Sequence, residues 1–155
     1  MQILIAAVGR PRDAALAAAI REYEQRAARY WPLQVREVRG AGGRQGGEAV
    51  REQEAEQLLG AIPGGARLVL CDELGEALSS NNFAQLVQAE RERAAEDLVF
   101  MVGGAFGVGA TVRSRAWRTL ALASWTLPHE LARLVLAEQL YRAGTIIRGE
   151  QYHKA

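Results

Sequence analysis

Apolar runs of strand length alternate with helical segments from one end of this chain to the other. Strands that alternate with helices pair in parallel, and the connecting helices cover the faces of the sheet. The alternation therefore predicts an α/β fold with a parallel-rich sheet and helices on both faces, in a single domain spanning residues 1–155. The predicted strands are residues 3–8, 33–38, 67–71, 97–102 and 120–124, and the predicted helices are residues 13–29, 48–59, 83–95, 112–116 and 130–147.

Two helix starts carry capping residues. Asp13 is predicted to cap the first helix, and Ser80 or Asn81 the third, because short polar side chains accept hydrogen bonds from the free N–H groups of a first turn.

Ligands of parallel sheets bind beyond the carboxyl ends of the strands. Three predicted strand ends are therefore candidate binding segments: residues 70–72, 103–104 and 124–127. The second is rich in glycine, which leaves room for a ligand to approach the backbone, although a turn without a ligand would show the same pattern. The glycines of this cluster are Gly103, Gly104, Gly107 and Gly109.

The glycine cluster does not match the common nucleotide-binding motifs. A dinucleotide-binding G-x-G-x-x-G beginning at Gly107 would require glycine where Val112 stands, and the phosphate-binding G-K-S/T is missing. No G-x-S-x-G is present either. These absences argue against dinucleotide and nucleoside triphosphate sites and against a serine hydrolase.

The composition is that of an ordinary globular protein, with 49% hydrophobic and 24% charged residues. We expect a cytoplasmic protein, because no apolar run is long enough for a bilayer and no leader precedes the first strand. With Cys71 as the single cysteine and only two histidines, neither an internal disulfide nor a metal site is expected.

The charge pattern leaves the partner open. The net charge is +1, and Lys154 is the only lysine among 19 basic residues. Arginine suits bidentate contacts with phosphates and base edges, but biased codon usage would explain the same excess.

The last helix and the tail contain the remaining candidate residues. His129 follows Pro128 at the helix start, and is either a helix-start residue or a catalyst. Glu138 and Arg142 are spaced as a surface ion pair. The polar tail contains Tyr152 and His153, and it either frays or orders over a substrate. The helix is apolar on more than one face, so we expect it to pack on the sheet and on a second surface such as another subunit.

Four segments together resemble a known family. They are Val102-Gly103-Gly104, Thr126-Leu127-Pro128-His129, Glu138-Gln139-Leu140-Tyr141-Arg142-Ala143 and Arg148-Gly149-Glu150-Gln151-Tyr152-His153-Lys154. In this order and spacing, over essentially the whole chain, they resemble the small SPOUT-superfamily methyltransferases that modify 23S ribosomal RNA. The similarity is greatest to the large-subunit pseudouridine N3-methyltransferase family.

This resemblance implies S-adenosylmethionine as the cofactor, held in a C-terminal trefoil knot. Because threaded chains are so rare, the knot rests on the resemblance alone. Leucine is common in the family at the position of Cys71, so the thiol is a departure that keeps the apolar character. In the segment 122–127 the contacts would come from backbone N–H and C=O groups. Carried over position by position, the cofactor residues are Cys71, Gly103, Leu122, Ala123, Ser124, Trp125, Thr126 and Leu127.

The implied reaction transfers a methyl group to N3 of a pseudouridine in 23S rRNA. The N3–H lies between two carbonyls and is weakly acidic, so it needs a proton acceptor or stabilisation of charge on the flanking oxygens. We expect Arg142 to orient the substrate while Glu138 holds it. Tyr152 and His153 would contact the base, with His153 in the pKa range of a proton acceptor, and His129 ranks below them.

The resemblance also implies partners. Members of the family are homodimers, so the tail of one subunit would complete the pocket of the other. The near-neutral charge predicts little affinity for naked RNA, and we expect the assembled ribosome to be the substrate. A non-catalytic ribosome-binding module that retains the fold is the alternative, although the presence of Arg142, Tyr152 and His153 favours an enzyme.

Overall fold

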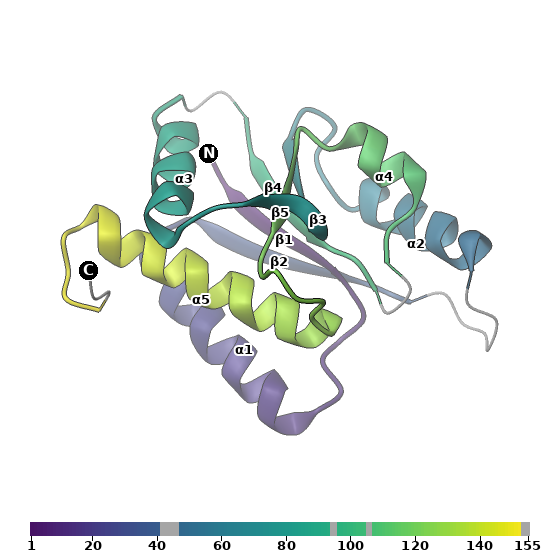
Figure 1. The fold of residues 1–155 in the computed structure, drawn as a ribbon, viewed down its shortest axis with the longest axis horizontal. Coiled ribbons are helices and arrows are strands. Elements are labelled where there is room, and N and C mark those ends of the chain that lie inside the picture. The colour runs from purple at the N-terminus through teal and green to yellow at the C-terminus, as the bar shows by residue number, and fades with distance from the viewer. Residues whose placement is uncertain (41–46, 94–95, 105–106, 153–155) are drawn as a thin grey trace.

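The computed structural model describes residues 1–40, 47–93, 96–104 and 107–152. Within these ranges, parallel strands form one five-stranded sheet in the order β2-β1-β4-β3-β5, flanked by helices (Figure 1). The predicted α/β fold with a parallel sheet is confirmed. The elements in chain order are β1 (Ile3–Val8), α1 (Ala14–Ala27), β2 (Leu33–Val38), α2 (Glu48–Gly60), β3 (Arg67–Ala77), α3 (Ser80–Arg93), β4 (Leu98–Val102), α4 (Ala110–Arg115), β5 (Arg118–Ala121) and α5 (His129–Ile147).

Helices cover both faces of the sheet, as predicted. Helices α1, α3 and α5 lie on one face, and α2 and α4 on the other (Figure 1). Successive residues of β4 pack alternately into the two cores: Phe100 joins the first cluster, and Val99 and Met101 join the second. Every residue of β4 is therefore buried, which explains why this strand is a continuous apolar run in the sequence.

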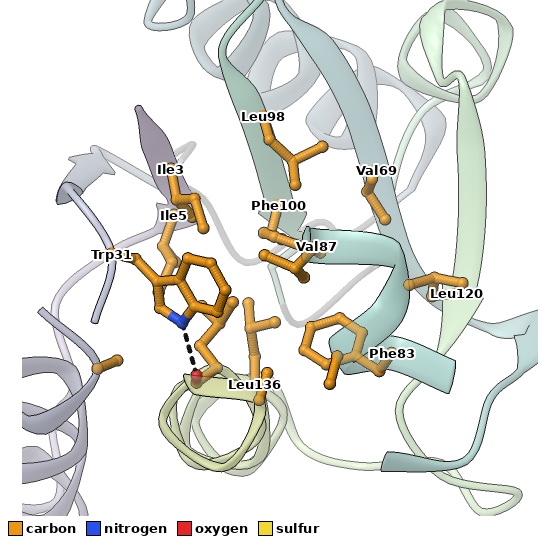
Figure 2. Close-up of a cluster of buried hydrophobic side chains, with 14 of the residues drawn as sticks. Ile3, Ile5, Trp31, Val69, Phe83, Val87, Leu98, Phe100, Leu120 and Leu136 are labelled. Carbon is orange, nitrogen blue, oxygen red and sulfur yellow. Dashed lines mark hydrogen bonds between the residues drawn. The ribbon is translucent and has the colours of Figure 1, made fainter. Parts of the chain in front are cut away.

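The larger core fixes α5 against the sheet. The indole N–H of Trp31 donates to the carbonyl oxygen of Leu140 at 2.8 Å, so this buried polar group is satisfied (Figure 2). Phe83 of α3 packs against Phe100 with ring centroids 5.6 Å apart. Leu136, Leu140 and Ala143 of α5 are buried in the same cluster, which fixes this helix on the sheet. Residues of the candidate site lie at both ends of α5.

Strands β3 and β5 differ from their predicted bounds. β3 continues to Ala77, beyond the predicted end at residue 71, and its pairing is irregular: Leu120 of β5 pairs with both Cys71 and Glu76. Gly75 lies against the β5 backbone, where an added Cβ would be 2.6 Å from the carbonyl carbon of Thr119. β3 therefore pairs with β5 at two places that are only a few residues apart along β3. The trefoil knot itself stays a prediction.

Strand β5 is shorter at its carboxyl end than predicted and ends at Ala121, so the residues that follow form a loop before α5. The predicted cap of α3, Ser80 or Asn81, is wrong by one or two residues: the Ser79 hydroxyl accepts a hydrogen bond from the Asn82 N–H at 3.1 Å. Asp13 caps α1 as predicted, accepting from the Leu16 N–H. None of the described helices is long and apolar enough to cross a membrane.

Candidate functional site

A cavity of about 700 Å³ lies beyond the ends of β4 and β5, beside the irregular part of β3. It is lined by residues of β3, of β4 and the glycines that follow it, of α4, and of the segment from Leu122 into α5. All the residues that the resemblance assigned to the cofactor line it except Ser124, which is exposed in the same loop. The lining residues from that prediction are Cys71, Gly103, Leu122, Ala123, Trp125, Thr126 and Leu127.

Glycine is required on one wall of the cavity. A Cβ at Gly103 would lie 2.6 Å from the Val108 side chain and 3.2 Å from the Gly107 carbonyl oxygen. Gly107 has a φ of +84° and donates its N–H to the Gly104 carbonyl oxygen at 3.1 Å. The glycines therefore make a tight turn, and this turn forms part of the cavity wall.

Cys71 lies on the wall as an apolar group. Burial, and secondarily the charge of Asp72, raise the pKa of its thiol to about 12. The thiol is therefore protonated at neutral pH and is not a nucleophile.

The rim of the cavity is charged: the sequence analysis included Asp72 in the candidate segment 70–72 but missed Glu73 and Arg113. Asp72 Oδ2 pairs with Arg113 Nη2 at 2.7 Å, and the Thr126 hydroxyl donates a hydrogen bond to the Glu73 carboxylate. Asp72 and Glu73 directly follow a predicted strand, and that position was a signal for them. Arg113 comes from α4, and no local pattern singled it out.

His129 is both the first residue of α5 and a lining residue of the cavity. The next turn of the helix is fixed by Arg133, which is 6% exposed. Its guanidinium pairs with Glu24 of α1 at 2.8 Å and with Glu37 of β2 at 2.7 Å. Two neighbouring elements, α1 and β2, thus hold the end of α5 that faces the cavity.

The other predicted residues form a separate cluster at the far end of α5. Arg142 contacts Glu138 Oε1 through Nη2 at 2.5 Å and through Nε at 3.0 Å. The Tyr152 hydroxyl donates to the same oxygen at 3.0 Å, and the Arg142 guanidinium lies 4.9 Å from the Tyr152 ring centroid. The Glu138–Arg142 pair is therefore part of a cluster that holds the tail as far as Tyr152. His153 lies outside the described residues.

Arg142 and Tyr152 are poor proton acceptors. The pKa of the Tyr152 hydroxyl is raised by burial and by hydrogen bonds with Tyr23 and Glu138. The hydrogen bond with Glu138 raises the pKa of Arg142 as well. Both groups keep their protons at neutral pH, which leaves them as hydrogen-bond donors.

The two groups of predicted residues do not meet within one chain. None of Glu138, Arg142 and Tyr152 lines the cavity. With a rise of about 1.5 Å per residue, the helix places Arg142 roughly 20 Å along its axis from His129. No cluster of His, Cys, Asp or Glu side chains suited to a metal ion occurs among the described residues.

Comparisons with known proteins match the chain over its length. A family model described as a predicted SPOUT methyltransferase matches residues 1–153. Proteins named ribosomal RNA large subunit methyltransferase H are 55% identical in Gemmatimonas aurantiaca, 42% in Geobacter sp. strain M21 and 43% in Rhodospirillum centenum. These alignments cover at least 99% of this chain and of each relative.

A solved structure is also similar. The SpoU methyltransferase AviRb from Streptomyces viridochromogenes aligns over 96% of this chain and 61% of its own, with a TM-score of 0.48 and 14% identity. The family model and the relatives confirm the resemblance found in the sequence: the chain belongs to the SPOUT methyltransferases, in the family of ribosomal RNA large subunit methyltransferase H.

Proposed function

We propose that this protein is an S-adenosylmethionine-dependent methyltransferase that methylates N3 of a pseudouridine in 23S rRNA. One observation carries the proposal: the positions that the family resemblance assigns to the cofactor meet around one cavity, although they come from segments far apart in the sequence. The name shared by the relatives, ribosomal RNA large subunit methyltransferase H, supports the RNA substrate.

The cavity fits the proposed cofactor in size and chemistry. Its volume of about 700 Å³ lies within the range of small-molecule sites. Leu122 and Leu127 offer apolar surface for an adenine ring, and the missing side chain of Gly103 leaves the wall open to backbone contact. S-Adenosylmethionine supplies an electrophilic methyl group on a sulfonium. The protonated thiol of Cys71 can line this site without being methylated itself.

Arg142 and Tyr152 would act on the substrate as donors. Methylation of N3 removes a proton and requires stabilisation of negative charge on the neighbouring carbonyl oxygens. Arg142 is oriented by Glu138 and stacked on Tyr152, so its donors are held in a fixed direction. The proton acceptor would be His153, with His129 at the cavity as the second candidate.

A homodimer would bring the two groups of residues together. Since Arg142 and Tyr152 do not line the cavity of their own chain, they would serve the cavity of a second copy. In a two-fold symmetric dimer, each helix α5 would then contribute His129 to one site and Arg142 to the other.

Ribosomes that lack the modification provide the test. We expect the purified protein to transfer labelled methyl groups from S-adenosylmethionine to these ribosomes, and nucleoside mass spectrometry to identify 3-methylpseudouridine. Fully modified ribosomes are the matched control. Protein-free 23S rRNA should be a poor substrate, because the net charge of +1 gives little attraction to phosphates.

A bacterial ribosome-modifying enzyme would work in the cytoplasm.

No methyl transfer to the unmodified ribosomes, together with ribosome binding that survives loss of Arg142 and Tyr152, would instead support the non-catalytic ribosome-binding module.

A further inference from the structure

The mouth of the cavity carries two exposed apolar side chains. Leu74 is 81% exposed and Trp125 is 82% exposed, although side chains of this size are usually buried to a much greater extent. Both line the cavity, and Trp125 is the only Trp, Tyr or Phe among its described lining residues. Since neither side chain packs in the core, core stability does not explain why large apolar side chains lie at the mouth.

The two chain segments that carry them are tied to each other. The Thr126 hydroxyl, next to Trp125, donates a hydrogen bond to the Glu73 carboxylate, next to Leu74. The Leu74 N–H donates to Asp72 Oδ1 at 2.9 Å, and Asp72 is in turn paired with Arg113. The Leu74 backbone is therefore held by Asp72, and the segment of Trp125 is joined to that of Leu74 through their neighbours, while both apolar side chains are exposed.

We propose that Trp125 and Leu74 form a platform on which an unpaired nucleobase of the RNA substrate stacks as the reacting nitrogen reaches the cavity. This inference rests on the proposed function. A base that is methylated on its ring must leave its own stack, and this loss costs free energy. Stacking on an indole at the mouth of the cavity would recover part of it, as aromatic side chains do where proteins bind single-stranded RNA.

The surroundings favour a nucleobase over a protein surface as the occupant. The apolar area at the mouth consists of two side chains among charged and polar neighbours: Asp72, Glu73, Arg113 and the exposed Ser124. A stable dimer interface needs about 800 Å² from each partner, far more than two side chains supply. The family resemblance assigns Trp125 to the cofactor through its backbone groups, so its indole would be free to contact RNA.

Substitutions of Trp125 test the platform in the full-length protein. We expect Trp125→Ala to raise the KM for unmodified ribosomes roughly tenfold and to weaken direct binding to large subunits by a similar factor. Trp125→Phe keeps an aromatic face and should recover most of the loss. Trp117→Ala is the matched control, because Trp117 lies under Arg67 and Arg118 and does not line the cavity.

Two further measurements test whether Trp125 contacts the cofactor or a second subunit instead of RNA. Titration calorimetry with S-adenosylmethionine should give the same affinity for Trp125→Ala and wild type, and sedimentation should give the same oligomeric state. An unchanged KM for ribosomes, a parallel loss of cofactor affinity, or dissociation of the dimer would each overturn the platform. Failure of the proposed function is recognised separately, because wild-type protein would then leave unmodified ribosomes unmethylated.

Discussion

Gly75 lies where the irregular part of β3 passes the backbone of β5. A Cβ here would be 2.6 Å from the Thr119 carbonyl carbon and 2.7 Å from the Leu120 backbone nitrogen. Because backbone cannot move aside like a flexible side chain, we expect Gly75→Ala to lower the free energy of unfolding by about 1–3 kcal/mol. Chemical denaturation of wild type and variant measures this difference in the free energy of unfolding. Gly65→Ala is the control, with nothing within 4 Å of its added Cβ, and equal stability of the two variants would contradict the close approach.

Cys71 predicts a pH dependence of stability. Burial raises the pKa of the folded thiol to about 12, against an ordinary value of 9.0. Between these values the unfolded chain loses the proton and the folded protein keeps it, so stability falls as pH rises above about 9. The loss attributable to Cys71 is at most about 1.4 kcal/mol per pH unit.

Unfolding curves of wild type and Cys71→Ala from pH 8 to pH 10.5 isolate this effect. We expect the wild type to lose stability more steeply than the variant above about pH 9. Parallel pH profiles would mean that the thiol ionises as readily in the folded protein as in the unfolded chain.

At the scale of elements, one buried arginine joins a helix to two neighbours. Arg133 of α5 pairs with Glu24 of α1 and Glu37 of β2. Removal of the cation would leave two carboxylates close together with little water, so we expect Arg133→Met to cost about 3 kcal/mol in thermal or chemical unfolding. Arg26→Met removes an exposed pair with Glu22 and should change stability little. Similar losses of stability in both variants would show that the buried network stabilises the protein no more than the exposed pair does.

The elements also show how far the sequence could predict the fold. β1 and β4 are buried on both faces, so their continuous apolar runs located them correctly. The second part of β3 contains Asp72, Glu73 and Glu76, which do not read as strand. Its pairing with β5 depends on contacts between segments more than 40 residues apart, and a local pattern does not contain them.

The candidate site could likewise be predicted only in part from the sequence. Gly103 could be found from its own neighbours, because a buried strand ends in glycines there. The cofactor positions at 122–127 came from the family resemblance, since their backbone contacts leave no periodic signal. The pair between Asp72 and Arg113 joins β3 to α4, and only the folded chain brings the two together.

At the scale of the whole molecule, α5 separates two sets of site residues. His129 lies at the cavity, and Arg142 lies more than three helical turns away. A mixture of two inactive variants can therefore show whether Arg142 serves its own chain or a second copy. Gly103→Leu would push against Val108 and the Gly107 carbonyl, which form the cavity wall, and would spare Arg142, whereas Arg142→Ala would remove the guanidinium and spare the cavity.

We expect neither variant to methylate ribosomes alone. An equal mixture should recover about a quarter of wild-type activity, because half of its dimers contain one chain of each kind and each of these has one complete site of two. The cavity of the Arg142→Ala chain would then be served by the arginine of its Gly103→Leu partner. Different affinity tags allow the mixed dimers to be purified, and unfolding curves check that each variant is folded. Mixing Arg142→Ala with a chain that carries both substitutions is the control, since no arginine is present at that position. If verified mixed dimers stay inactive while wild-type dimers exchanged in the same way are active, Arg142 acts within its own chain, and α5 must bend or move to bring it to the cavity.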